Sequence, residues 1–136
     1  MTRDPLRTIA LTLAALIVLA SCACKLWGEV KVGKASYYSV KSCRREGTSG
    51  IMANGQPLDD EKLTCAMWGP KFGTVVKVTN LDNGKSVTVV CKDRGPGTKA
   101  WRSGVLIDLS VRAFRSIAPL RRGVVRVRVE TIERGK

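Results

Sequence analysis

The sequence contains no histidine, and no two of its cysteines are spaced as a CxxC pair. Imidazole nitrogens and closely spaced cysteine thiolates are the usual ligands of protein-bound zinc. The absence of both argues against a structural or catalytic zinc site. We therefore expect no metal ion, and nothing in the sequence indicates another cofactor.

Acidic residues are scarce: the 136-residue chain has 24 Lys and Arg against 11 Asp and Glu, a formal charge of +13. Such an excess attracts polyanions, which include nucleic acid, anionic lipid and anionic cell-wall polymers. The basic residues are spread along the chain, and no zinc finger, helix-turn-helix pattern or aromatic-rich strand pair accompanies them. We therefore predict a solvated basic surface and no nucleic-acid partner.

The apolar run at residues 8–20 is too short for a comfortable membrane span, but it has the length of the apolar core of a signal peptide. Arg3 and Arg7 precede it, as basic residues precede such a core. Residues 1–21 are therefore predicted to be an export signal. An uncleaved membrane anchor is an alternative.

The export signal ends in Leu19-Ala20-Ser21-Cys22, which resembles the lipobox of bacterial lipoproteins. That resemblance makes Cys22 the expected site of lipidation and residues 22–31 a short tether. Ala23 follows the cysteine, and a non-acidic residue there resembles lipoproteins of the outer membrane that face the periplasm. Ordinary cleavage after Ala23 is the competing interpretation. An attachment to the plasma membrane would need the same lipid anchor.

Export places the remaining cysteines in an oxidising compartment, where disulfides form and persist. Cys24 lies in the predicted tether. We therefore expect one disulfide among Cys43, Cys65 and Cys91, and the sequence alone does not give the pairing.

Apolar and alternating runs predict a mainly β protein with one helix. The helix is expected at residues 108–118, where Ser110 can cap its start and Pro119 ends it. Residues 41–62 are polar and rich in glycine, and they predict a long loop. The Asn83-Gly84 pair between two valine-rich runs predicts a hairpin. The six predicted strands are residues 35–38, 63–67, 74–80, 86–92, 105–107 and 124–130, which suit either a small closed barrel or a sandwich.

One carboxylate stands out, because Asp93 follows the apolar strand at residues 87–91 and precedes the turn Gly95-Pro96-Gly97. Catalytic and binding groups are frequent where a strand ends and a loop begins. An aspartate at such a place can also do no more than bond the backbone N–H groups of the turn. Both interpretations are open from this segment alone.

Several blocks of the sequence stand out in their order and spacing. They are Gly33-Lys34-Ala35-Ser36-Tyr37-Tyr38, Ala53-Asn54-Gly55, Leu63-Thr64-Cys65-Ala66, Phe72-Gly73-Thr74, Val78-Thr79-Asn80-Leu81, Asn83-Gly84-Lys85-Ser86-Val87, Asp93-Arg94-Gly95-Pro96 and Ile107-Asp108-Leu109-Ser110. Together they resemble the rare lipoprotein A family of septal ring lytic transglycosylases over residues 33 to about 130. The resemblance implies that residues 32–132 form a six-stranded double-psi β-barrel related to expansins, and that peptidoglycan glycan strands are the substrate.

The family's catalytic aspartate corresponds to Asp93, which the resemblance makes the expected acid and base. The family's histidine and glutamate fall on Met67 and Gln56. A lytic transglycosylase uses the sugar's own 6-hydroxyl group in place of water, so that one carboxyl group can donate a proton and then accept one. A hydrolase with a separate water-activating group normally needs two carboxyl groups.

Aromatic faces and hydrogen-bonding side chains are expected to hold the sugar rings. Trp68 and Trp101 offer aromatic faces, and core or loop packing is the alternative for each. Asp108 is a second candidate carboxylate, although an aspartate at that place can also serve the start of the following helix. The predicted substrate-binding residues are Asn54, Thr64, Met67, Trp68, Arg94, Trp101 and Asp108. The competing function is a non-catalytic, expansin-like module that binds or loosens the wall, and in either case we expect a monomer.

Overall fold

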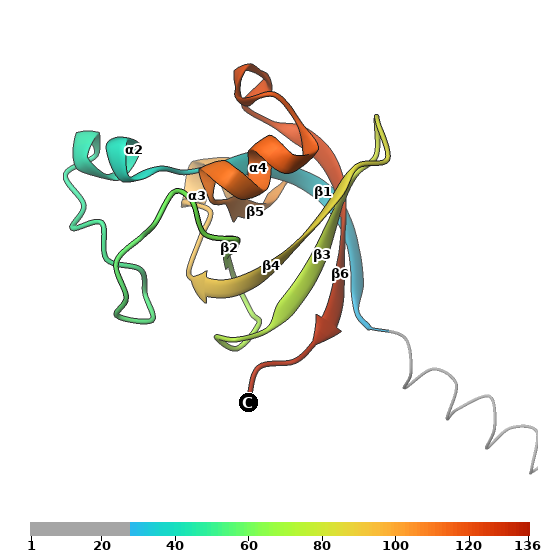
Figure 1. The fold of residues 1–136 in the computed structure, drawn as a ribbon, viewed down its shortest axis with the longest axis horizontal. Coiled ribbons are helices and arrows are strands. Elements are labelled where there is room, and N and C mark those ends of the chain that lie inside the picture. The colour runs from blue at the N-terminus through green and yellow to red at the C-terminus, as the bar shows by residue number, and fades with distance from the viewer. Residues whose placement is uncertain (1–27) are drawn as a thin grey trace, which may run out of the picture.

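The computed structural model describes residues 28–136, in which six strands close into a barrel (Figure 1). The predicted export signal, Cys22 and Cys24 lie outside the described residues. Around the barrel the strands follow the order β1-β5-β2-β4-β3-β6. Their bounds are β1 Val30–Tyr37, β2 Thr64–Met67, β3 Val75–Asn80, β4 Ser86–Asp93, β5 Val105–Leu109 and β6 Val125–Glu133.

Every strand that the sequence predicts is present, and the barrel is confirmed over the sandwich. β1 runs parallel to β5, and β2 runs parallel to β4, while the other neighbours are antiparallel. The first strand starts earlier than the sequence predicts. Val30 and Lys31, assigned above to the tether, pair with Glu130 and Val129 of β6, so these two residues belong to the barrel.

The core forms because one face of each long strand carries small branched apolar side chains. In β3, β4 and β6 the valines that point inward alternate with exposed or partly exposed residues. Phe114 of helix α4 (Val111–Ile117) is fully buried and packs against Tyr37 with ring centroids 4.9 Å apart. The buried valines of these three strands are Val76, Val78, Val87, Val89, Val125, Val127 and Val129.

The sequence predicts one helix, whereas residues 28–136 contain three α-helices and a short 3-10 helix at Leu120–Arg122. The predicted helix is α4, and Ser110 caps it by accepting the Ala113 N–H at 3.3 Å. The two additional helices are α2 (Val40–Arg45) and α3 (Thr98–Arg102). Neither buries a residue, so neither leaves an apolar period in the sequence. No helix in the described part of the chain is long and apolar enough to cross a membrane.

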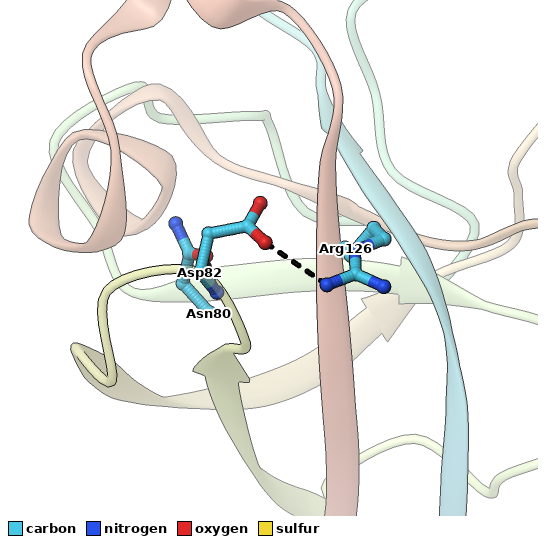
Figure 2. Close-up of polar contacts among 3 residues, drawn as sticks. All are labelled: Asn80, Asp82 and Arg126. Atoms are coloured by element: carbon cyan, nitrogen blue, oxygen red, sulfur yellow. Dashed lines mark hydrogen bonds and ion pairs between the residues drawn. The ribbon is translucent and has the colours of Figure 1, made fainter.

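The turn between β3 and β4 is the hairpin predicted from Asn83-Gly84. Asn80 Oδ1 accepts the Asp82 N–H at 2.9 Å, and Asp82 Oδ1 accepts a hydrogen bond from Arg126 Nη2 at 3.0 Å (Figure 2). Gly84 has a φ of 73°, which an L side chain adopts only with strain. The turn is therefore held by its own residues, by Arg126 of β6, and by the Ile117 carbonyl oxygen of α4, which accepts the side-chain amides of Asn80 and Asn83 at 2.9 Å each.

Candidate active site

A groove of ≈ 840 Å³ lies where the C-terminal ends of β1, β4 and β5 meet. Helix α2 and the loop after it form one side, and the start of α3 forms the other. In Figure 1, α2 and this loop extend away from the barrel. The side chains that bear charge or an ionisable hydroxyl in its lining belong to Tyr37, Tyr38, Glu46, Asp93, Arg94, Lys99 and Asp108.

Asp93 is the last residue of β4 and lines this groove. Its Oδ1 atom accepts the N–H groups of Ala53 and Arg94, each at 2.8 Å. The first donor comes from the long loop and the second from the turn, so the carboxylate ties two segments together. Asp93 therefore organises its turn, as one of the two interpretations predicts, and it also lines the groove; a catalytic or binding role there stays a prediction.

Asp108 lies on β5 opposite Ser36 of β1 and lines the same groove. The Ser36 hydroxyl group donates a hydrogen bond to Asp108 Oδ1. Burial raises the pKa of Asp108 above its usual value, and the charge of Asp93 adds to this rise, while the Ser36 hydrogen bond opposes it. Asp108 therefore does not cap α4, which Ser110 does.

Gly95 brings the turn onto this carboxylate. A Cβ atom added at Gly95 would lie 3.4 Å from Asp108 Oδ2 and 3.3 Å from the Ala66 Cβ. Both distances are at or below ordinary van der Waals contact. The glycine thus lets the backbone that follows Asp93 approach Asp108 closely.

Tyr38 contributes a buried hydroxyl group to the groove. Within residues 28–136 this hydroxyl group has no hydrogen-bonding partner of standard geometry, and the charge of Asp93 acts on it. The pKa of Tyr38 is raised, first by burial and then by the negative charge of Asp93. Tyr37 packs on Phe114 of the core, as strand alternation predicts for one of the two tyrosines.

Arg94 lines the groove, but its guanidinium group is bound elsewhere. The guanidinium carbon lies 4.0 Å from the centre of the Phe72 ring, and Nη1 donates to the Met67 carbonyl oxygen at 3.1 Å. Nη1 also lies 3.6 Å from Cys91 Sγ. The side chain therefore fastens the end of β4 to β2 while it lines the groove, and its predicted part in sugar binding stays a prediction.

Met67 does not line the groove either, which corrects its assignment to substrate binding. Its side chain is 4% exposed and belongs to the hydrophobic core, because all residues of β2 are buried between β4 and β5. In this chain the position of the family's histidine thus provides packing and a carbonyl group for Arg94.

Asn54 and Thr64 lie away from the groove. Thr64 is 4% exposed and lines a separate cavity of ≈ 120 Å³ together with Gln56 and Lys92. Gln56 Oε1 accepts hydrogen bonds from Asn54 Nδ2 at 3.1 Å and from Lys92 Nζ at 3.3 Å. The side-chain amides of Asn54 and Gln56 shape the loop whose Ala53 N–H group donates to Asp93.

Trp68 and Trp101 are exposed and face a second, smaller hollow on the other side of the turn after Asp93. Their position is neither the core nor the groove itself. The sequence predicts aromatic faces near the site, and the structure places these two beside it.

Glu46 and Lys99 line the groove but were not predicted from the sequence. Glu46 ends α2, and its charge helps to raise the pKa of Asp108. No signal in the sequence could reveal this, because α2 itself buries no residue.

Cys43, Cys65 and Cys91 are free thiols in this structure. Cys65 and Cys91 are fully buried at paired positions of β2 and β4. Hydrogen bonding between them is the main cause that lowers the pKa of Cys91 to about 6 and raises that of Cys65. Cys43 lines the groove and is partly exposed.

The barrel and its groove have known counterparts. Residues 30–129 match the family model described as lytic transglycolase. The chain therefore belongs to the lytic transglycolase family, and its fold is a double-psi β-barrel. Two groups of relatives make this more specific.

Among curated proteins, a probable endolytic peptidoglycan transglycosylase RlpA of Nostoc sp. is 41% identical over 103 residues, covering 75% of this chain and 26% of the relative. The endolytic peptidoglycan transglycosylase RlpA of Vibrio cholerae is 37% identical over 105 residues, covering 77% of this chain and 36% of the relative. The chain thus spans about a quarter to a third of the length of these two relatives.

Among solved structures, the Streptomyces papain inhibitor superposes with a TM-score of 0.60 at 27% identity, covering 79% of this chain and 97% of the inhibitor. A Clavibacter michiganensis expansin superposes with a TM-score of 0.55 at 21% identity, covering 77% and 51% of the two chains. The expansin likeness concerns the fold alone.

Proposed function

We propose that this protein is a peptidoglycan lytic transglycosylase that cleaves the MurNAc–GlcNAc bond of glycan strands during cell-wall remodelling. The observation that carries the proposal is the placement of Asp93 in the groove, with its carboxylate fixed by two backbone N–H groups. The residues that build this arrangement lie within the part matched by the family model.

In this reaction the 6-hydroxyl oxygen of the MurNAc ring attacks its own anomeric carbon. The bond from that carbon to the GlcNAc oxygen breaks, and a 1,6-anhydro ring closes. One proton must go to the leaving oxygen, and one must leave the 6-hydroxyl group. The protein has to supply and remove protons, and it has no attacking water to activate.

Asp93 is proposed to make the proton transfers at the reacting bond. Asp108 supports it as the second carboxyl group in the groove. Because burial raises the pKa of Asp108, this group holds its proton to a higher pH than an exposed aspartate would. It can therefore donate a proton within the groove at a higher pH than an exposed aspartate could.

The proposal is tested by incubating the purified protein with peptidoglycan sacculi and analysing the released fragments by mass spectrometry. Release of muropeptides that end in 1,6-anhydro sugars is expected. Release of reducing-end sugars instead would contradict the transglycosylase proposal and indicate a hydrolase.

A non-catalytic module that binds or loosens the wall is the second candidate, and a specific observation favours it. Met67 stands where the family has a histidine, and its side chain is buried in the core. If sacculi pull down the protein and yield no soluble fragments, this second candidate replaces the first.

We also propose that the protein is exported and anchored by a lipid on Cys22, facing the periplasm from the outer membrane, and that it acts as a monomer. The proposal rests on the apolar run and the lipobox-like Leu19-Ala20-Ser21-Cys22. Cys22→Ala should move the protein from the membrane fraction to the soluble fraction of the envelope. Unchanged retention in the membrane would contradict lipidation, and size-exclusion chromatography with light scattering tests the monomer.

A further inference from the structure

Two tryptophans form a hollow beside the groove, and the reaction outlined above does not use it. Trp68 and Trp101 are 48% and 45% exposed, large values for indole side chains. With Pro96 and Thr98 they line a space of ≈ 390 Å³. We call this space the tryptophan hollow.

The tryptophan hollow adjoins the groove. Thr98 lines both of them, and Pro96 belongs to the turn that directly follows Asp93. Only the segment from Gly95 to Thr98 separates the carboxylate from the indoles. A linear ligand that passes over Asp93 would therefore reach the hollow as it leaves the groove.

The first indole is held in place by the same turn. Trp68 Nε1 donates a hydrogen bond to the Pro96 carbonyl oxygen at 2.7 Å. This bond satisfies the only hydrogen-bonding group of the indole. What Trp68 offers to a ligand is therefore the apolar face of a fixed ring, and fixing the ring in advance lowers the entropic cost of binding.

We propose that the tryptophan hollow binds a pyranose ring of the same glycan strand, outside the residues that flank the broken bond. This inference rests on the proposed function, because it takes a glycan as the ligand of the groove. A pyranose ring has one face of C–H groups and a rim of hydroxyl groups. Two indole faces with a threonine hydroxyl at the edge match this combination.

A membrane surface is the other apolar partner that exposed tryptophans bind. The position of the hollow argues against it. Thr98 lines both the hollow and the groove, so a bilayer pressed against Trp68 and Trp101 would also lie against the groove and hinder a polymer from entering it.

The test is calorimetric titration of the full-length protein with the β-1,4-linked hexamer of N-acetylglucosamine. Trp101→Ala should weaken binding about tenfold, the effect of losing roughly one aromatic stacking contact. Trp101→Phe should retain most of the affinity, since it keeps an aromatic face. The matched control is Ile132→Ala, which removes an exposed apolar side chain of β6 away from the hollow.

Equal affinity of the wild type and Trp101→Ala for the hexamer would overturn the inference, and so would the absence of hexamer binding by the wild type. Weakened binding of Trp101→Ala to phosphatidylglycerol vesicles, with hexamer binding unchanged, would also overturn it and assign the hollow to a membrane. If the wild type releases no anhydro products but Trp101→Ala still weakens hexamer binding, the proposed catalysis fails and the sugar subsite stands.

Discussion

Asp82 and Asp93 follow two neighbouring antiparallel strands, yet the fold uses them differently. Asp82 lies in the exposed turn after β3, and its carboxylate pairs with the exposed side chain of Arg126 (Figure 2). Asp93 ends β4, and its carboxylate accepts N–H groups from two segments that are distant in sequence. Both residues are aspartates at or just after the end of a strand, so the difference lies in what each carboxylate bonds and faces.

Asp93 lies among other acidic side chains, whereas Asp82 is paired with the opposite charge of Arg126. Asp93 lines a groove together with Asp108 and Glu46. Burial and the negative charges of Asp93 and Glu46 raise the pKa of Asp108. The buried Tyr38 hydroxyl group lies beside them without a standard hydrogen bond. Clustered carboxylates and an unpaired buried hydroxyl group lower the stability of the fold. Such costs are typical of functional sites, where the residues are selected for function.

The largest effects are expected at Asp93. Asp93→Asn keeps an oxygen that can accept the Ala53 and Arg94 N–H groups, so it should keep the melting temperature and lose cleavage by roughly 10²–10⁴-fold. Asp93→Ala also removes that acceptor and should cost about 1 kcal/mol of unfolding free energy in addition. Thermal unfolding and product release, measured on both variants, separate the two roles. Equal stability of the two variants would refute the structural role.

Asp108→Asn should reduce cleavage by about tenfold or more while stabilising the protein at neutral pH. The folded pKa of Asp108 is raised, so the folded state binds more protons than the unfolded state as pH rises above about 4. The contribution of Asp108 to wild-type stability therefore falls as the pH rises through its folded pKa and then levels off. Asp108→Asn has no titrating group at this position and lacks this loss. The check is the melting temperature of both proteins across pH 3.5–8. A difference that does not grow with pH would contradict the assignment.

Gly95→Ala should have an intermediate effect. Its Cβ atom would lie 3.3 Å from the Ala66 Cβ and 3.4 Å from Asp108 Oδ2. We expect a loss of about 1 kcal/mol in unfolding free energy from this crowding, together with slower cleavage as Asp108 is displaced. Gly97→Ala is the matched control, because a Cβ atom there meets nothing within 4 Å. Equal effects of the two substitutions would show that crowding at Asp108 is not the cause.

The smallest effect is expected at Asp82. Asp82→Asn breaks an ion pair whose two side chains are 46% and 68% exposed. Exposed ion pairs contribute about 0–1 kcal/mol, and added salt screens them. Chemical denaturation at low and high salt should show a small loss that shrinks with salt. A loss of several kcal/mol would mean that the turn supports the barrel far more than its exposure indicates.

The sequence predicted the strands well because valines alternate with polar residues in β3, β4 and β6, and a strand that buries one face must have this pattern. The sequence also predicted the position of Asp93 at the end of a strand, because an apolar run precedes it and a turn follows it. It failed for Met67, since β2 is buried on both faces and carries no alternation that separates core from groove. It also failed for Glu46, because α2 is fixed by the Ser39 and Ser42 capping bonds and buries no residue. The structural contacts of Arg94 with Phe72 and Met67 could not be predicted, because only the closed barrel brings these two partners to it.

The most direct test of the account is a side-by-side assay of Asp93→Asn and Asp82→Asn on peptidoglycan sacculi, with each melting temperature measured in the same buffer. The account predicts that Asp82→Asn releases 1,6-anhydro muropeptides at the wild-type rate, while Asp93→Asn is folded and slower by roughly 10²-fold or more. Wild-type product release by a folded Asp93→Asn would contradict the claim that this carboxylate carries the chemistry.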